Sequence, residues 1–359
     1  GAKMKEKAAR EVSFVELCIE ERRAKLSDHF LYKIKECVDW ERLRKTIRKG
    51  YKKNKNATGN PAYDPIVLFK ILLLEKWYKL SDYQAEERIN DSFLFSDFID
   101  IALSAPAPDH STICRFRNEL TKLNLMDELL DTFNTQLVEL GILQIKEGAL
   151  VDATIVSSPR KPHRPKVLEI AADREDARSE AQKQEEEDFH QKLRYTEPGI
   201  DHQARFVKKG NKYYWGYKHH VCTDKRGLVV KLNTTPANRS DTQELPKLLA
   251  GALLPEHTRV FADKGYDSAA NRSCLKDLKL RDGIMRRKLK GKEFSERERV
   301  RNRAISKRRC FVEHAFGGIH LWFGGGVARY VGVERTHTQG ILEALAYNMK
   351  RMLRIPLSS

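Results

Sequence analysis

The chain has 359 residues, enough for more than one domain and for at least one sizeable hydrophobic core. Lysine and arginine number 67 against 50 acidic residues, so the net charge of +17 favours a polyanionic partner over an ordinary solvated basic surface. The six cysteines include no Cys-x-x-Cys pair, which argues against a disulfide framework and a zinc site. No apolar run is long enough to span a membrane. We therefore expect a cytoplasmic protein.

The first part of the chain has the pattern of helices from about residue 11 to 141. Asp64 and Pro65 form a helix start, with Asp as the N-cap and Pro as the first helical residue. Asp109 caps a later amphipathic helix in the same way. We therefore predict an all-α domain over residues 1–145, with a role in DNA binding or dimerisation.

Two arginines of the helix that Asp109 caps, Arg115 and Arg117, are candidates for contacts with DNA. Short helices with polar loops and basic side chains are compatible with reading base edges. The alternative is that both arginines belong to an ordinary solvated helix face.

The pattern changes to strands at Gly148. We predict that residues 146–359 form an α/β domain with a mixed sheet, so that the whole chain, with its all-α first domain, is of the α+β class. A charged insertion at about 158–200 has high helix propensity but little apolar face. The predicted elements are a strand at 148–158, a hairpin around the turn 224–227, a helix at 241–254, a strand at 259–262, a short strand at 282–287, and a helix from Arg297 to about Phe323.

Three carboxylates lie within or at the end of the predicted strands and helices of this second part of the chain. Asp152 lies within the first strand, Asp263 ends a later strand, and Glu313 lies on the last predicted helix. If the two strands are neighbours, the carboxylates meet, and each raises the other's pKa unless a cation neutralises them. Carboxylate oxygens select Mg²⁺ or Mn²⁺, and two such ions support in-line phosphoryl transfer. The alternative for Asp263 is a turn cap before Gly265.

The helix of Glu313 carries further polar residues on one side. Arg309, Glu313 and His320 follow a spacing of i, i+4 and i+11, which returns them to one helix face. An arginine one turn before a carboxylate forms either a surface ion pair or a phosphate contact beside a metal ligand. The segment 286–309 has twelve basic and three acidic residues, and this charge favours the second interpretation.

The adjacent histidines His219 and His220 lie on the predicted hairpin. Adjacent residues of a strand point to opposite faces of the sheet. We therefore expect core or surface histidines here and not a metal-binding pair.

Taken in order, these motifs resemble those of the DDE transposases of bacterial insertion sequences, in the groups written IS-four and IS-five. The matching segments run from about Asp64 to Leu353, and their ordered agreement makes coincidence improbable. They are DHSTICRFRNEL, VDATIVSSP, GYKHHVCTDKRGLVV, TPANRSDTQELPKLL, VFADKGYDSAANR, RRCFVEHAFGGIHLWFG and LEALAYNMKRML.

The resemblance implies an RNase H-like catalytic core that cleaves the DNA backbone at transposon ends and joins the freed 3′-OH ends to target DNA. Asp152, Asp263 and Glu313 would be the catalytic triad and would hold two Mg²⁺ ions, for which Mn²⁺ can substitute. The implied partner is double-stranded DNA, as terminal inverted repeats and as target, bound by a homodimer and associated with the bacterial nucleoid.

The resemblance also implies DNA contacts near the scissile bond. Lys218 belongs to a Tyr-Lys pair that resembles one facing the active site in the family. The C-terminal signature of the group is Tyr-x2-Arg-x3-Glu-x6-Lys. Arg309 and Glu313 match its Arg and Glu, whereas Ser306 and His320 stand at its Tyr and Lys positions. The expected phosphate contacts are Arg309, Lys218, His320, Lys264 and Arg308.

Two other classes of function are alternatives to an active transposase. One is a domesticated, non-catalytic DNA-binding relative, although all three acidic positions are intact. The other is a basic RNA-binding or structural protein in which the acidic residues only cap helices and form ion pairs. If Asp263 is not catalytic, Asp267 is the first replacement candidate.

Overall fold

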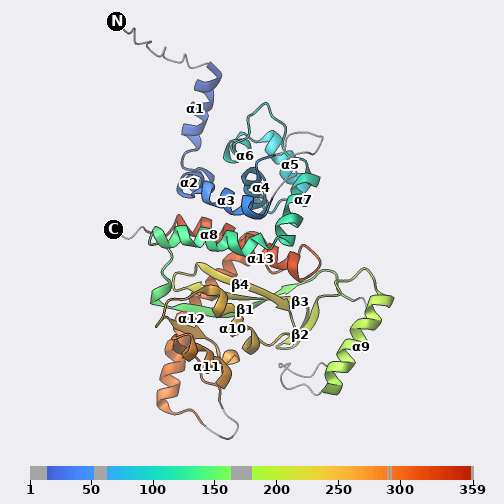
Figure 1. Ribbon diagram of the computed structural model, residues 1–359, viewed down its shortest axis with the longest axis vertical. Coiled ribbons are helices and arrows are strands. Elements are labelled where there is room, and N and C mark those ends of the chain that lie inside the picture. Colours follow the sequence, from blue (N-terminus) through green and yellow to red (C-terminus); the bar gives the residue numbers. More distant parts are fainter. Residues whose placement is uncertain (1–13, 52–62, 163–179, 289–290, 292, 357–359) are drawn as a thin grey trace.

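The computed structural model describes residues 14–51, 63–162, 180–288, 291 and 293–356, and Figure 1 shows their arrangement. The first part of the chain is helical, as predicted. Its helices are α1 (Phe14–Leu26), α2 (Phe30–Cys37), α3 (Trp40–Gly50), α4 (Pro65–Tyr78), α5 (Asp82–Asp91), α6 (Phe93–Phe98), α7 (His110–Lys122) and α8 (Leu125–Glu139).

The second part of the chain combines a sheet with helices. The strands are β1 (Ala149–Ser157), β2 (Arg205–Lys209), β3 (Lys212–Asp224), β4 (Val229–Pro236), β5 (Arg259–Ala262) and β6 (Arg281–Ile284). The helices are α9 (Glu180–Thr196), α10 (Asp241–Ala252), α11 (Ala269–Asp277), α12 (Glu296–Phe323) and α13 (Val333–Met352). In the predicted insertion 158–200, α9 is a helix, and residues 163–179 lie outside the described residues.

Polar side chains begin the predicted helices in the expected way. Asp64 accepts a hydrogen bond from the N–H of Ile66 at 3.0 Å, directly before Pro65. Asp109 accepts one from the N–H of Thr112 at 2.7 Å. These bonds satisfy donors that the first turn of a helix leaves without an intrahelical partner, so the predicted starts of α4 and α7 are confirmed.

The strands form one mixed sheet in the order β2-β3-β1-β5-β6, with β4 also paired to β3. β1 is antiparallel to β3 and parallel to β5, and β5 is parallel to β6. Both β2 and β4 are antiparallel to β3, and they pair with successive parts of this long strand. The mixed sheet with flanking helices agrees with the predicted RNase H-like fold.

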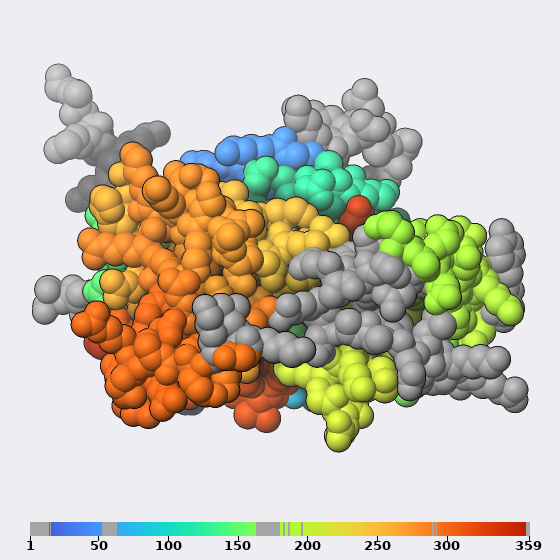
Figure 2. Space-filling view, turned by 90° about the horizontal axis from the view of Figure 1, so that it is seen from below, coloured from blue at the N-terminus to red at the C-terminus, as the bar shows by residue number. Residues whose placement is uncertain are grey.

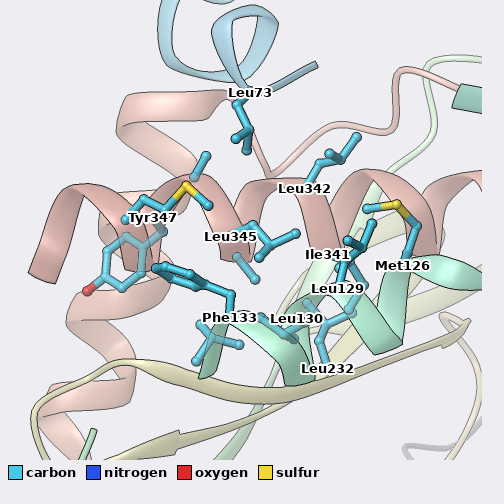
Figure 3. Packing of buried hydrophobic residues seen from close by; sticks show 14 of the residues in the cluster. Leu73, Met126, Leu129, Leu130, Phe133, Leu232, Ile341, Leu342, Leu345 and Tyr347 are labelled. Carbon is cyan, nitrogen blue, oxygen red and sulfur yellow. The ribbon is translucent and has the colours of Figure 1, made fainter. Parts of the chain in front are cut away.

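Helix α13 joins the helical part of the chain to the sheet. It packs against α4, α7 and α8 as well as β4 (Figure 1). Figure 3 shows Phe133 of α8 and Leu232 of β4 close to Leu345 of α13, with Leu73 of α4 nearby. The boundary at residue 145 therefore divides a continuous hydrophobic core, and the two predicted domains remain a prediction.

Charged side chains are buried where α4 meets α13. Lys76 Nζ lies 3.8 Å from Glu343 Oε1, and both side chains are only 1% exposed. Gln339 Nε2 donates to the same Glu343 oxygen at 2.8 Å. Burial lowers the pKa of Lys76 and raises the pKa of Glu343. The two groups therefore depend on each other to remain charged in the core.

We expect Lys76→Ala to lower the free energy of unfolding by roughly 3–5 kcal/mol, because it leaves the Glu343 carboxylate buried without its cation. The double variant Lys76→Met, Glu343→Leu should lose much less free energy of unfolding, since neither member of the pair is left as an unpaired charge. Urea unfolding at pH 7 measures both, with Lys25→Ala of the exposed Lys25–Glu21 pair as the control. A double variant as unstable as Lys76→Ala would exclude the electrostatic explanation.

Candidate active site

Parallel pairing of β1 with β5 places Asp152 and Asp263 side by side. Leu150 is the partner of Phe261; Asp152 follows Leu150 two residues later on β1, and Asp263 follows Phe261 two residues later, directly after the end of β5. Since side chains two residues apart point to one side of an extended chain, both carboxylates project from the same face of the sheet, one on β1 and the other at the end of the neighbouring β5. Burial raises the pKa of Asp152, and the charge of Asp263 adds to this effect. The predicted meeting of these two residues is confirmed.

Helix α12 supplies a cation to this pair. Arg309 Nη2 donates to Asp152 Oδ2 at 2.7 Å, and the N–H of Ala153 donates to Asp152 Oδ1 at 2.9 Å. The guanidinium lowers the pKa of Asp152 and so opposes burial and Asp263. Arg309 Nε is buried and has no hydrogen-bond partner among the described residues. The arginine thus holds one carboxylate and retains an unsatisfied donor.

Asp263 also caps the turn that follows β5. Its Oδ1 accepts the N–H of Gly265, and the short 3-10 turn Lys264–Tyr266 begins directly after it. A Cβ atom at Gly265 would lie 2.7 Å from that oxygen, so a side chain there would displace the carboxylate. The turn-cap alternative is therefore observed, and the cap fixes the direction in which the carboxylate points.

Glu313 lies apart from the aspartate pair. It is exposed on α12, one turn after Arg309. In the described part of the chain, no group of three or more His, Cys, Asp or Glu side chains is arranged to hold a metal ion. The structure thus brings Asp152 and Asp263 together and leaves Glu313 at the surface of the neighbouring helix.

A basic cleft of about 990 Å³ opens beside Asp263. Nine basic residues line it against two acidic ones, Asp241 and Asp263, and they come from β2, β3, α12 and the segments before α10 and after β5 and β6. Figure 2 shows the orange residues of α11 and α12 and the yellow-green residues of β2 and β3 on one face of the molecule. Such a cleft attracts a phosphate backbone.

The other residues expected near the scissile bond have different surroundings. Lys218 lines the cleft, but its Nζ donates to Asp241 Oδ1 at 2.9 Å and is already ion-paired. Lys264 is exposed and also lines the cleft. His320 Nε2 lies 3.3 Å from Thr154 Oγ1, and burial, followed by the charge of Lys209, lowers the pKa of this histidine.

The two arginines of α7 point in different directions. Arg115 is exposed, and its side chain donates to Ser111 and Thr112 within the same helix. Arg117 is buried, with Nη2 2.6 Å from Asp82 Oδ2 and Nη1 3.2 Å from Glu75 Oε2. The expectation that Arg117 contacts DNA is wrong in this structure, because its guanidinium is enclosed by these carboxylates.

His219 and His220 point to opposite faces of the sheet, as predicted. His219 Nδ1 lies 2.9 Å from Thr234 Oγ1, and His220 Nε2 lies 2.9 Å from Thr235 Oγ1. Burial lowers the pKa of His219 to about 3 and that of His220 to about 4. Both are therefore neutral core histidines at pH 7.

Asp241 is a cleft residue that the sequence analysis did not identify. It is the first residue of α10, it binds Lys218, and it lines the same cleft as Asp263. Its sequence signal is an acidic residue at a predicted helix start. Because acidic residues stabilise any helix N-terminus, that signal alone does not distinguish a cleft residue from an ordinary cap.

Two family models match the chain. One, described as a transposase domain (DUF772), matches residues 19–119, and the other, described as a transposase DDE domain, matches residues 144–349, which is more than half of the chain. The chain belongs to the DDE transposases. This DDE transposase is 38% identical over 236 residues to the transposase for insertion sequence element IS1106 of Neisseria meningitidis serogroup B, a match covering 66% of the chain and 75% of the relative. No solved structure matches it significantly.

These matches confirm the resemblance seen in the sequence. The protein is a DNA transposase of an insertion sequence, and its enzymatic activity is DNA cleavage and strand transfer. Neither comparison favours a non-catalytic relative. DDE transposases act on DNA and in general use divalent metal ions. Among the described residues, no helix is long and apolar enough to cross a membrane.

We expect Arg309→Met to raise the pKa of Asp152 further, because the guanidinium at 2.7 Å is lost while burial and the charge of Asp263 remain. Carboxyl ¹³C chemical shifts titrated in metal-free buffer measure this pKa. Arg308→Met is the matched control, since the Arg308 guanidinium lies over the Phe261 ring, 5.3 Å from its centroid. An unchanged Asp152 pKa in Arg309→Met would show that the ion pair is absent in solution.

Proposed function

We propose that Asp152, Asp263 and Glu313 are the catalytic residues of this transposase and that they hold Mg²⁺, as two ions per site, for which Mn²⁺ can substitute. The reaction is cleavage at the ends of an insertion sequence, followed by transfer of the 3′-OH ends into target DNA. The observation that carries the proposal is the pair of aspartates side by side, one on β1 and the other at the end of the parallel strand β5, next to a basic cleft.

The aspartate pair fits a divalent cation. Two carboxylates on adjacent strands repel each other, and the raised pKa of Asp152 reflects its burial and this repulsion. A hard cation bound between them would remove the repulsion, and carboxylate oxygens are the ligands that Mg²⁺ prefers. When bound, such ions would activate the attacking oxygen and stabilise the leaving oxygen of a phosphoryl transfer.

The remaining groups of the site are suited to holding the DNA backbone. Arg309 retains a buried donor, Nε, without a partner among the described residues, and a phosphate oxygen would satisfy it. Lys264 follows Asp263 directly and is exposed in the cleft. Lys218 becomes available to a phosphate only if its ion pair with Asp241 opens.

We infer that Glu313 joins the aspartates when metal and DNA bind. Arg309 contacts Asp152, and His320 contacts Thr154, two residues further along the same strand. Glu313 lies between these two contacts on the same face of α12. We infer that this carboxylate turns from solvent toward the cation, since a change of side-chain rotamer moves a glutamate oxygen by several ångströms.

We expect Asp152→Asn, Asp263→Asn and Glu313→Gln each to lower the rate of cleavage by at least about 100-fold, because several kcal/mol of metal-dependent transition-state stabilisation is lost. DNA binding in metal-free buffer should stay within about threefold of the wild type. The measurement is nicking of a labelled transposon end in Mg²⁺. The control is Glu296→Gln, an exposed carboxylate at the start of the same helix. Full nicking activity in Asp263→Asn would contradict the assignment of Asp263 as a catalytic residue.

We propose that the helical part of the chain reads the transposon ends through α7, while the cleft holds phosphates near the cut. Arg115 is exposed on α7, and Asn118 lies three residues later, so they share one helix face. Arginine and asparagine are the side chains that pair with guanine and adenine edges in the major groove. Two such ends must be processed together, which supports a homodimer on DNA.

We expect Arg115→Ala to weaken binding to the element's own ends by about 5- to 150-fold while binding to unrelated duplex changes little, because one base contact is worth about 1–3 kcal/mol. Fluorescence anisotropy with both duplexes gives this ratio. Lys122→Ala, at the exposed end of the same helix, is the control and should affect both duplexes alike. Equal losses on both duplexes in Arg115→Ala would show that Arg115 contacts phosphates only.

A further inference from the structure

The segment after β6 forms one wall of the basic cleft. Arg286 and Arg287 line the cleft together with Lys264 and Gly265. The backbone of this wall is held by α12, because Asn302 Oδ1 accepts the N–H of Arg286 at 2.8 Å and Asn302 Nδ2 donates to the Arg286 carbonyl at 3.0 Å. The wall is thus tied to the helix that carries Arg309.

Asp267 ties the same wall to the loop that follows Asp263. Its Oδ2 accepts the N–H of Arg287 at 2.7 Å, and its Oδ1 accepts Arg272 Nη2 at 2.8 Å. Burial alone would raise the pKa of Asp267, but the Arg287 N–H and the Arg272 guanidinium hold this pKa below its ordinary value. The carboxylate is therefore ionised and engaged through both oxygens.

Arg287 closes this set of contacts. Its Nη2 donates to the Lys264 carbonyl at 3.0 Å, while its own N–H is bound by Asp267. The loop from Asp263 to Asp267 is thereby linked to Arg287 near both of its ends. A change at Asp267 would remove its hydrogen bond to the N–H of Arg287. The basic wall would then no longer be held in a fixed position relative to Asp263.

We propose that Asp267 is a positioning residue that fixes Arg287 and the basic wall, so that DNA phosphates are held at a set place beside Asp263. The proposal rests on the proposed function, since it requires DNA in this cleft. Asp267 does not act on the reacting phosphate itself, because its oxygens already accept hydrogen bonds from Arg287 and Arg272. It acts through Arg287, one of the cleft cations.

The test is a double-mutant cycle on DNA affinity in metal-free buffer, where no cleavage occurs. Arg287→Ala should reduce the slope of log affinity against log salt by about one, as expected when one phosphate contact is lost. Asp267→Asn should reproduce most of this loss, since Asn cannot serve Arg287 and Arg272 together. The double variant should bind within about twofold of Arg287→Ala, because both changes remove the same contact.

Asp282→Asn is the matched control. Asp282 pairs with the same Arg272 and with Arg301, but no hydrogen bond joins its side chain to Arg287 among the contacts described. Its DNA affinity and salt slope should equal those of the wild type. Urea unfolding of every variant separates a lost phosphate contact from a general loss of stability. A merely structural role would lower the free energy of unfolding but would leave unchanged the slope of log DNA affinity against log salt measured for the folded protein.

Two results would overturn the proposal. One is a double variant whose losses simply add, which would show that Asp267 and Arg287 act independently. The other is an unchanged affinity and salt slope in Asp267→Asn. If the wild-type chain binds and cleaves DNA in either case, the proposed function stands and only the role of Asp267 fails; if the wild-type chain does not bind DNA, the proposed function itself fails.

Discussion

The candidate active site depends on one constraint, the placement of two carboxylates side by side in a partly buried position. The pairing of Leu150 with Phe261 forces Asp152 and Asp263 to adjacent positions on one face of the sheet. Such a pair is unfavourable in a half-buried place unless cations surround it. Positive charge is supplied by the ion pair of Arg309 with Asp152 and by the excess of basic residues in the cleft. The contact of α12 with β1 and the basic lining of the cleft are both compatible with this constraint.

The helical layer and the sheet depend on each other through α13. This helix is buried along most of its length, so neither side has a complete hydrophobic core without it. The buried Lys76–Glu343 pair and the hydrogen bond from Trp77 Nε1 to the Ala346 carbonyl fix its position on α4. The helical layer and the sheet therefore share one hydrophobic core, which links the helices proposed to read DNA to the candidate active site.

The sequence predicted the elements whose patterns are local. Caps located α4 and α7, the alternation of β-branched residues located β1, and the three expected acidic positions lie on the elements foreseen for them. Residues whose environment depends on distant segments were not predictable. Arg115 and Arg117 differ by about 200° around a helix, and only the packing of α7 against α4 and α5 decides which is buried. β2 is a short basic strand that exists because β3 extends beyond β4 to pair with it.

The length of α12 fixes how far its basic residues extend from the aspartate pair. The helix runs for 28 residues and extends away from the sheet in Figure 1, with Arg309 near its middle and its first turn at Glu296. At about 1.5 Å per residue, these two points are roughly 20 Å apart, and B-DNA rises about 3.4 Å per base pair. The distance from Arg309 to the first turn of this helix therefore corresponds to the length of about six base pairs. Because both points lie on one continuous helix, inserting four residues between Glu296 and Arg309 would lengthen this distance by about 6 Å and turn the first part of the helix by about 40° relative to the aspartate pair.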